Sequence, residues 1–493
     1  MIVRIKIDGF KSLVKTDLFF GPFTCIIGAN AIGKSNLFDA LVFLSNLADK
    51  TLIEAAKSVR SETQSSNIRD IFYRSGNDVF NQMSFEVDMI IPKEGVDDLG
   101  QKAYASTTAV RYKLVLELND DTEFNEPLSI VHESLDPIPI KEIRKHIHFS
   151  PSKDWMNSVI RGRKSSHFIS TSDDLVKLHL DTGGNPNHSD KDTNRKRSKS
   201  GRPMQFTKER MPRTLLSNVT AESPTAFLVR QEMRNWMMLQ LEPSALRQPN
   251  TIYEIKNAEI QANGANLPAT LYRLNAQKEK HDIYQEITNK VHDLIPDILE
   301  VNVDRDEKRD LLTLEVNFKD GLTLPAQSLS DGTLRFLGLA ILEADNNNTG
   351  IICLEEPENG INPKQIDNIL GLLQEIATDI DYDVDNDNPL RQVIINTHST
   401  VVINKIKPED LYYADFRELY HEPFAKKISV TTFFSLPGTW RVNEHLALPV
   451  ASGDINQYVN GQVDGLTFNY VRNLRQKLKR NDEMEGINNT LFD

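Results

Sequence analysis

A glycine-rich segment near the start of the chain has the residue types and the spacing of a phosphate-binding loop. Residues 28–35 follow the pattern G-x-x-x-x-G-K-S, from Gly28 to Ser35. Glycines let the backbone aim its N–H groups at phosphate oxygens, and a helix that begins at the loop adds the positive end of its dipole. The lysine can reach the β- and γ-phosphates, and the serine hydroxyl can bind Mg²⁺. A chance match in a tight turn is the alternative, but an apolar strand pattern at 23–27 and a helical pattern after the loop favour the phosphate-binding interpretation.

Two adjacent carboxylates follow an apolar run later in the chain. Residues 350–354 have the composition of a buried strand, and Glu355 and Glu356 come directly after it. In phosphate-loop ATPases the first such carboxylate holds Mg²⁺ through water, and the second can polarise the attacking water. Two acids at the end of a buried strand are costly unless a metal ion or a water uses them. A strand that leads into a solvated acidic loop is the alternative.

Two further segments carry weaker signals of the same chemistry. Ser330 and Gly332 stand at the start of a predicted helix at 331–345, where they would form a second phosphate-binding helix end. His398 follows an apolar strand at 391–396 and can contact a γ-phosphate. The alternatives are a helix-capping serine and a histidine that only satisfies local hydrogen bonds.

The elements expected around these residues alternate between strand and helix, which is typical of an α/β fold with a mostly parallel sheet. The predicted strands lie at 1–8, 23–27, 84–91, 108–118, 299–304, 311–318, 350–354 and 391–396, and the predicted helices at 222–242, 267–296, 331–345 and 363–378. We therefore expect one α/β fold that is split by an insertion.

Four regions are predicted from these patterns. They are an N-terminal ATPase lobe at 1–135, a mostly helical insertion at 136–297 with a flexible basic loop at 184–213, a C-terminal ATPase lobe at 298–440 and a C-terminal extension at 441–493. The stretch 191–213 holds nine Lys or Arg residues against two Asp or Glu residues, a local net charge of +7. A solvated loop is the more ordinary interpretation of this charge than a nucleic-acid or partner contact.

Composition excludes several classes of protein. The chain has 493 residues, 39% hydrophobic and 26% charged, with a net charge of −13, which is enough apolar material for a large core. No apolar run is long enough to span a membrane, and the N-terminus lacks a signal peptide, so we expect a cytoplasmic protein without membrane attachment. The two cysteines, Cys25 and Cys353, exclude a disulfide framework and are expected to be buried thiols. Such acidity argues against nonspecific coating of nucleic acid.

Two metal-like patterns are discounted. His146 and His148 form a pair, but no third ligand is evident in the sequence. Aspartates alternate from Asp379 to Asp387, but the glycine and glutamate that a calcium loop needs are missing at the corresponding positions. A TOPRIM nuclease would need a further domain. We expect a solvated acidic loop.

We call residues 329–335, which contain Ser330 and Gly332, the signature segment. The order of phosphate loop, insertion, signature segment, acidic pair and histidine resembles the ABC-class ATPases, in the branch of RecF, the SMC heads and the overcoming-lysogenization-defect (OLD) ATPases. The runs Ile-Asp-Gly-Phe-Lys-Ser-Leu, Leu-Ser-Asp-Gly-Thr-Leu-Arg-Phe-Leu, Leu-Glu-Glu-Pro-Glu-Asn-Gly-Ile-Asn-Pro and Asn-Thr-His-Ser are similar to those of AAA-type ATPases in bacterial defence operons. These motifs lie within residues 1–40 and 240–405. The resemblance implies an ABC-type phosphate-loop ATPase head.

This resemblance also implies ATP and Mg²⁺ as cofactors and two heads that enclose two ATP molecules, in a homodimer or a higher even oligomer. Ser35 and Glu355 would serve Mg²⁺, Glu356 would be the general base, and His398 would sense the γ-phosphate. The nucleotide would be bound by Gly28, Asn30, Gly33, Lys34, Ser35 and Asn36, and by Ser330 and Gly332 of the second copy. Asp331 and Thr333 differ from the glycine and glutamine of transporters. A glutamine-loop residue is left open between Gln64, Gln82 and Arg74.

Function is predicted from the resemblance as a sensor or scaffold of bacterial antiviral defence, similar to the ATPase subunits of PARIS, Septu and retron systems. The effector would be a separate TOPRIM-like or HNH nuclease, and the trigger DNA or a phage protein. A RecF-like, DNA-dependent ATPase of DNA repair is the alternative. A transporter subunit is disfavoured by the size, the insertion and the RecF-like opening of the chain.

Overall fold

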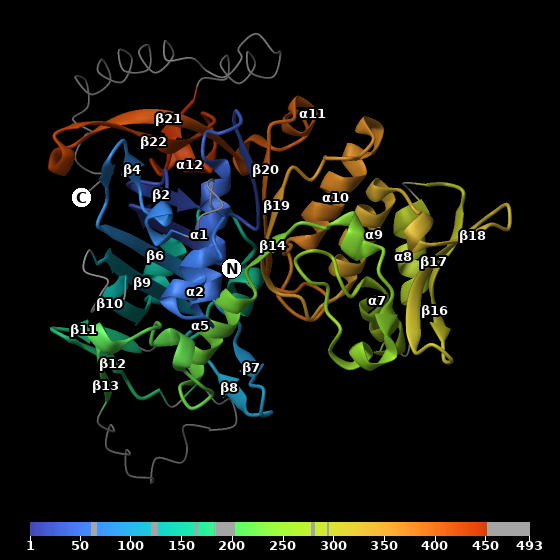
Figure 1. Ribbon diagram of the computed structural model, residues 1–493, viewed down its shortest axis with the longest axis horizontal. Helices are drawn as coiled ribbons and strands as arrows, with labels where there is room; N and C mark the ends of the chain where they lie inside the picture. Colours follow the sequence, from blue (N-terminus) through green and yellow to red (C-terminus); the bar gives the residue numbers. More distant parts are fainter. Residues whose placement is uncertain are drawn as a thin grey trace. The chain divides into compact units, whose positions relative to one another are not determined.

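The computed structural model describes residues 1–60, 67–119, 127–162, 166–181, 183, 203–277, 282–292 and 295–450. They form two compact units (Figure 1). Among the described residues, unit 1 contains those of Met1–Trp236, Ile380–Val384 and 407–450, and unit 2 contains those of Met237–Asp379 and Asp385–Ile406. This division differs from the predicted boundaries at 135, 297 and 440, because each unit is built from segments that are distant in the sequence.

An antiparallel sheet of eight strands is the main layer of unit 1. Its order is β13 (Met204–Thr207), β12 (Leu175–Leu178), β11 (Ile169–Ser172), β10 (Leu128–Pro137), β9 (Ala109–Leu118), β6 (Gln82–Ile90), β1 (Ile2–Asp8) and β2 (Thr16–Phe19). The strands predicted at 1–8, 84–91 and 108–118 are confirmed. Their alternating side chains place one apolar face of the sheet toward the core.

The first part of the predicted helical insertion contributes strands to this sheet. Residues 169–207 supply β11, β12 and β13. The same insertion also contains the helices α3 (Ile140–His146), α4 (Lys153–Val159) and α5 (Pro224–Arg234). Each of these strands has four residues, too few for a clear sequence period, and pairing from β10 outward holds them in place. In the segment expected to be a flexible loop, residues 184–202 lie outside the described part, whereas Met204–Thr207 form β13.

Helix α1 (Lys34–Leu47) packs on this sheet and is followed by α2 (Leu52–Lys57). Phe43 of α1 meets Phe10 and Phe85, and the ring centroids lie 5.6 to 5.8 Å apart across the three pairs. These aromatic side chains are fully buried, so α1 is anchored to the sheet by one apolar face.

The other strands of unit 1 bring its C-terminal part beside the predicted strand at 23–27. Strand β3 (Phe23–Ile27) pairs in parallel with β21 (Leu411–His421), which pairs antiparallel with β22 (Lys426–Ser435). Unit 1 also contains the hairpins β4 (Arg74–Ser75) with β5 (Asp78–Val79) and β7 (Glu94–Val96) with β8 (Lys102–Tyr104), the helix α12 (Trp440–Asn443), and β23 (Leu448–Pro449), which pairs with β22.

Unit 2 contains parallel strands and the helices between them. Strand β19 (Gly350–Glu355) lies between β14 (Met237–Leu239) and β20 (Arg391–Thr397), all parallel. Its helices are α6 (Pro243–Leu246), α7 (Leu267–Gln277), α8 (Ile283–His292), α9 (Asp331–Ala344), α10 (Ile366–Ile376) and α11 (Thr400–Ile403). A second, antiparallel sheet contains β15 (Asn250–Thr251), β16 (Ile298–Asp306), β17 (Leu311–Phe318) and β18 (Thr323–Pro325).

Most elements predicted after residue 298 are confirmed, and two predicted helices are shorter. The helix expected at 267–296 is two helices, α7 and α8, because no apolar residue at 278–282 continues the pattern. The helix expected at 222–242 ends at Arg234, since the Met-Met-Leu run that follows pairs with β19 as strand β14.

Apolar helix faces form the core of unit 2. Helix α10 buries residues at the i, i+3, i+4, i+7 spacing of an amphipathic helix, namely Ile366, Ile369, Leu370 and Leu373. Arg273 of α7 and Asp345 form a buried ion pair of 2.6 Å in the same unit.

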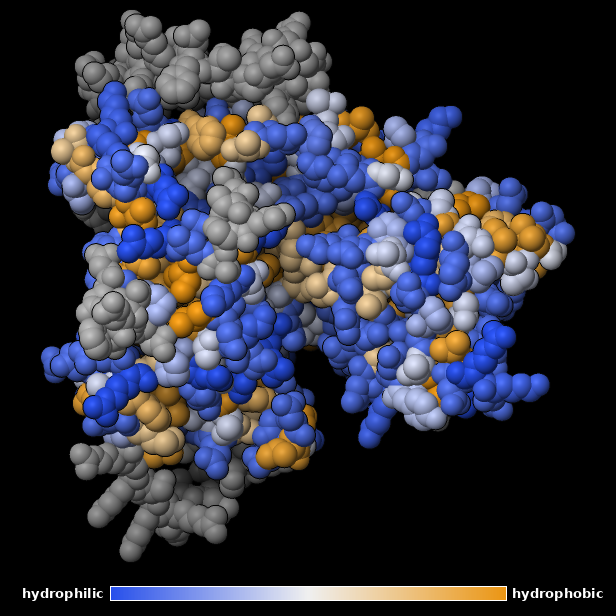
Figure 2. Space-filling view, in the orientation of Figure 1, coloured by the Kyte–Doolittle hydropathy of each residue, from blue (hydrophilic) through white to orange (hydrophobic). Residues whose placement is uncertain are grey.

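On the face drawn in Figure 2, hydrophilic residues predominate among the described ones, and hydrophobic residues gather in small separate groups.

The discounted metal patterns have structural roles. His146 forms an ion pair with the buried Asp88 at 2.9 Å, and His148 stacks on Trp440. The aspartates from Asp379 to Asp387 are exposed, as expected. Within the described part of the chain, no cluster of three or more His, Cys, Asp or Glu side chains could hold a metal ion, and no helix could cross a bilayer.

Both cysteines are buried and neither forms a disulfide bond, which confirms the prediction of buried thiols. Cys25 lies on β3 and Cys353 on β19. Burial, and then the charge of Glu355, raises the pKa of the Cys353 thiol. Neither thiol is therefore placed for nucleophilic chemistry.

Candidate nucleotide-binding and hydrolysis site

The predicted phosphate loop lies between a buried strand and a helix of unit 1. Strand β3 ends at Ile27, and α1 begins at Lys34 with Gly33 as its N-cap residue. Gly33 has a φ of 96°, in the region that favours glycine. Gly28 also needs its small size, because a Cβ there would lie 2.5 Å from the carbonyl oxygen of Ala414. Strand, loop and helix therefore follow the order that the sequence predicts.

Lys34 lies beneath the loop and aims its ammonium group at the loop backbone. The side chain is buried, and Nζ donates to the carbonyl oxygens of Gly28 at 2.6 Å and Ala29 at 2.8 Å. Asn30 in the loop is exposed, and Ser35 on the first turn of α1 is half-buried. An ammonium and a helix N-terminus can donate to phosphate oxygens, and the oxygen of a hydroxyl can bind Mg²⁺, so the residues present fit the expected cofactors.

A chain of hydroxyl groups fixes the loop from the side. Ser12 accepts from the Asn36 amide at 2.7 Å, and its Oγ lies 2.6 Å from the hydroxyl of Thr431. Thr431 Oγ1 in turn donates to the carbonyl oxygen of Ile32 at 2.7 Å. The Asn36 side chain, predicted to bind nucleotide, thus braces the loop in this structure.

A charged cluster lies beside the first turns of α1. Asp39 forms ion pairs of 2.7 Å with both Lys11 and Arg60. Nη2 of Arg60 also donates to the carbonyl oxygen of Ser35 at 3.3 Å. This cluster ties the segment after α2 to the helix that carries the loop.

The acidic pair and the histidine lie together in unit 2. Strands β19 and β20 are in register, so that Glu355 is opposite Asn396, whose amide donates to Glu355 Oε1 at 3.2 Å. Glu356 follows the strand in a left-handed conformation, with a φ of 47°, and its N–H donates to the Asn396 carbonyl at 2.9 Å. This backbone turns the Glu356 side chain away from the strand direction.

Both carboxylate oxygens of Glu356 have hydrogen-bond partners. Oε1 lies 2.6 Å from Nδ1 of His398, and Oε2 accepts from the Asn359 amide at 2.7 Å. Glu356 and His398 keep 28% and 44% of their side-chain surface exposed. A carboxylate that is oriented but accessible to water is suited to general-base chemistry.

The signature segment forms a capped helix end. Ser330 Oγ accepts from the N–H of Thr333 at 3.2 Å, so the capping role offered as the alternative is present. Arg247 supports the same turn through Asp331 at 2.6 Å and the Leu329 carbonyl at 3.0 Å. Gly332 lies against the loop after Glu356, since a Cβ there would be 3.1 Å from the Gly360 carbonyl oxygen. Contact of this turn with a nucleotide stays a prediction.

The open glutamine-loop position is not resolved to one residue. Gln64 lies outside the described residues. Gln82 donates to Glu117 at 3.0 Å on the eight-stranded sheet, and Arg74 lies 3.9 Å from Asp70.

Several contacts were not predicted from the sequence. Asn359 and Arg335 contact or support Glu356, and Thr431 braces the phosphate loop. A turn-forming asparagine three residues after the second carboxylate was the available signal for Asn359. No local signal marks Thr431, which is distant from the loop in the chain.

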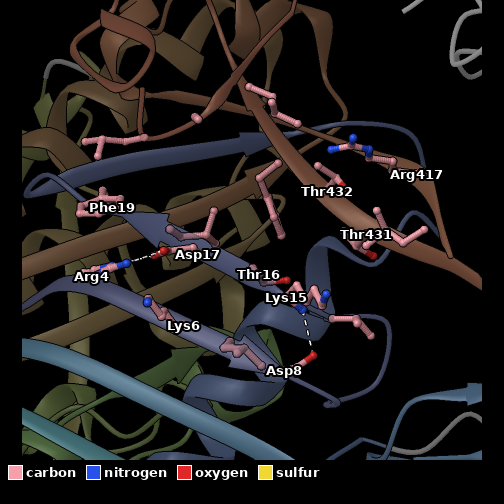
Figure 3. A pocket seen from close by; sticks show the side chains of 18 of the residues that line it. Arg4, Lys6, Asp8, Lys15, Thr16, Asp17, Phe19, Arg417, Thr431 and Thr432 are labelled. Atoms are coloured by element: carbon pink, nitrogen blue, oxygen red, sulfur yellow. Dashed lines mark hydrogen bonds and ion pairs between the residues drawn. The ribbon is translucent and has the colours of Figure 1, made fainter. Parts of the chain in front are cut away.

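A cavity of about 690 Å³ in unit 1 contains none of the predicted site residues. It is lined by β1, β2, β21, β22 and residues 444–448. Figure 3 shows Arg4 paired with Asp17 and the Lys15 backbone directed at Asp8. Thr431 lines this cavity and also braces the phosphate loop.

Comparison with known proteins identifies one family and several similar folds. Residues 23–168 and 184–404 match the family described as "AAA domain, putative AbiEii toxin, Type IV TA system". No protein with a curated function matches this sequence. Among solved structures, an Smc head bound to the C-terminal winged-helix domain of ScpA is 14% identical, over 88% of this chain and 98% of that chain, with a TM-score of 0.42.

Two further Smc heads are similar at the same level. The Pyrococcus furiosus head, solved with an extended coiled coil and the C-terminal domain of ScpA, is 12% identical, with coverage of 90% and 99% and a TM-score of 0.41. The Thermotoga maritima head is 11% identical, with coverage of 88% and 98% and a TM-score of 0.34. The family match spans the phosphate loop, the signature, the acidic pair and His398, and it confirms the predicted ATPase-domain class. The chain therefore belongs to the AAA-domain family that carries the putative AbiEii toxin description.

Proposed function

We propose that this chain is an ATP-binding and ATP-hydrolysing subunit of a bacterial antiviral defence system. It would act as a sensor or scaffold that dimerises head-to-head around ATP and controls a separate effector, such as a TOPRIM-like or HNH nuclease. The family description names a toxin–antitoxin system, which supports a role of this kind. DNA or a phage protein would be the trigger, and higher even oligomers would be built from the dimer.

Nucleotide binding is assigned to the phosphate loop. Lys34 would contact the β- and γ-phosphates after leaving the carbonyl oxygens of Gly28 and Ala29, which now accept its hydrogen bonds. Ser35 would hold Mg²⁺ directly, and Glu355 would serve the same ion through water. When bound, the ion neutralises charge on the phosphates. Ser330 and Gly332 of a second copy would close the site.

The observation that carries the hydrolytic part is the double hydrogen bonding of the Glu356 carboxylate. Its oxygens are oriented by His398 and Asn359 at 2.6 and 2.7 Å, which leaves the group fixed at the end of a buried strand. Glu356 would accept a proton from the water that attacks the γ-phosphate, while His398 holds the carboxylate and contacts the phosphate. Proton transfer to a positioned carboxylate is the step that general-base catalysis requires.

ATP turnover of the purified chain, of Glu356→Gln and of Lys34→Ala tests the proposal. The wild-type chain should hydrolyse ATP, Glu356→Gln should bind ATP without turning it over and accumulate as a dimer, and Lys34→Ala should not bind ATP. Near-normal turnover by Glu356→Gln would remove Glu356 as the base, and normal affinity in Lys34→Ala would remove the phosphate-loop assignment.

The same assay with double-stranded DNA separates the two functional classes. Turnover that does not respond to DNA, and a protein that co-purifies with the ATPase, would support the sensor or scaffold role. Strong stimulation by DNA at moderate salt would instead favour a DNA-dependent ATPase of repair.

A further inference from the structure

The loop after Glu356 touches the helix that carries the signature. Gly332, in the first turn of α9, lies against Gly360 closely enough that a Cβ would be 3.1 Å from the Gly360 carbonyl oxygen. One turn along the same helix, the Arg335 guanidinium donates to the carbonyl oxygen of Asn359. The first turns of α9 and the loop 358–361 are therefore in direct contact.

Asn359 connects this contact to the proposed base. Its backbone carbonyl accepts from Arg335, and its side-chain amide donates to Glu356 Oε2 at 2.7 Å. The other oxygen of Glu356 faces His398, so the amide of Asn359 determines the orientation of the carboxylate about its own axis. Asn359 itself is exposed, so its side chain is held by this hydrogen bond rather than by packing.

Arg335 is not explained by stability alone. Its Nε is buried and has no hydrogen-bond partner among the described residues. A buried donor without an acceptor costs about 1–3 kcal/mol, and such a group calls for an explanation other than stability. Nη1 of the same guanidinium donates to the Asn359 carbonyl, which links α9 to the residue that orients Glu356.

We propose that Arg335 and Asn359 are positioning residues that transmit the state of the signature helix to Glu356. This inference rests on the proposed function. When the Ser330 turn of α9 contacts the nucleotide of a second copy, a shift of α9 moves the Asn359 carbonyl through Arg335, and the Asn359 amide turns the Glu356 carboxylate. Each chain would bind one ATP in its own phosphate loop and contact the second copy's ATP through its signature segment. Hydrolysis of the first ATP would thus respond to the presence of the second.

The test compares ATP binding, KM and kcat in four variants: Asn359→Ala, Asn359→Asp, Arg335→Ala and the double variant Asn359→Ala/Arg335→Ala. Each single change to alanine should lower kcat about tenfold, the effect of one lost hydrogen bond to a charged group, while KM and ATP affinity stay within about twofold. Asn359→Asp should lower kcat further than Asn359→Ala, although it preserves the shape, because it places a carboxylate against that of Glu356. The double variant should be no slower than the slower single variant, because both residues act in series.

Two exposed residues of the same unit supply matched controls. Arg309→Ala on the β16–β17 hairpin and Asn289→Ala on α8 remove the same chemical groups far along the chain from the loop, and turnover should be unchanged. Arg335 is half-buried, so if its alanine variant fails to fold, Asn359→Asp and Asn359→Ala still test the relay at an exposed position.

The outcomes separate the inference from the proposed function. Absence of turnover in the wild-type chain, or full turnover in Glu356→Gln, overturns both. If Glu356→Gln abolishes turnover but the Asn359 and Arg335 variants turn over ATP as fast as the control variants, the proposed coupling through Arg335 and Asn359 is overturned and the proposed function stands. Multiplicative losses in the double variant would also overturn it, since independent residues would then be acting.

Discussion

Replacing Gly33 by alanine tests the geometry of the phosphate loop most directly. Gly33 has a φ of 96°, where an L-residue costs about 1–2 kcal/mol. The new Cβ would also overlap the hydroxyl groups of Ser12 and Thr431, which lie 2.6 Å apart and cannot both retreat without losing their contact. Overpacking of this kind adds about 1–3 kcal/mol, so the total is about 3 kcal/mol.

A second glycine separates the two contributions. Gly76 also has a positive φ, of 65°, but a Cβ added there would meet no heavy atom within 4 Å. Gly76→Ala therefore carries only the backbone cost, about 1–2 kcal/mol. The difference between the two variants measures the overlap with Ser12 and Thr431.

The assay is an ATP titration followed by calorimetry, together with urea unfolding of both variants. If the loop of Gly33→Ala rearranges, ATP affinity should fall about a hundredfold, because each tenfold corresponds to about 1.4 kcal/mol. If the loop holds, the free energy of unfolding should fall instead by about 3 kcal/mol. Wild-type ATP affinity combined with the unfolding energy of Gly76→Ala would refute the contact between the loop and the two hydroxyl groups.

Three other predictions concern buried groups. Burial raises the pKa of Glu133 to about 7, although its carboxylate accepts hydrogen bonds from backbone N–H groups. The stability that protonated Glu133 contributes is therefore full below about pH 4.5 and is lost as the pH rises through about 7. Urea unfolding between about pH 5 and 8 should show a fall of about 3 kcal/mol in the free energy of unfolding, and Glu133→Gln should lack this fall. Asp345→Ala should lower the free energy of unfolding by about 3–5 kcal/mol, because the buried charge of Arg273 would lose its counter-ion. The double variant Asp345→Leu/Arg273→Met removes both charges, so it should lower the free energy of unfolding by less in the same assay. Ellman's reagent should label neither Cys25 nor Cys353 in the native protein and both in urea; labelling of the native chain would contradict their burial.

Local patterns determined the parts of the site that lie within one segment. The spacing of Gly28, Gly33 and Lys34, preceded by an apolar strand and followed by a helical pattern, predicts a loop between strand and helix, which the structure has. The buried runs at 350–354 and 391–396 predict parallel strands, and these place Glu355 and His398 at the same strand ends. Such features depend on hydrogen bonds and burial over a few neighbouring residues, so a single sequence carries them.

Contacts between distant residues were decided only by the tertiary structure. Ser12 and Thr431 are 419 positions apart, and their hydroxyl contact exists because β22 returns beside the loop. The left-handed turn at Glu356 brings Asn359 and His398 to its two oxygens, and the packing of Gly332 on Gly360 brings Arg335 to Asn359. Each contact depends on strand register, turn geometry and close packing rather than on residue type. The sequence by itself therefore predicts which residues would bind and hydrolyse a nucleotide, and it determined the strands and helices that carry them, whereas the tertiary structure decided which side chains contact them.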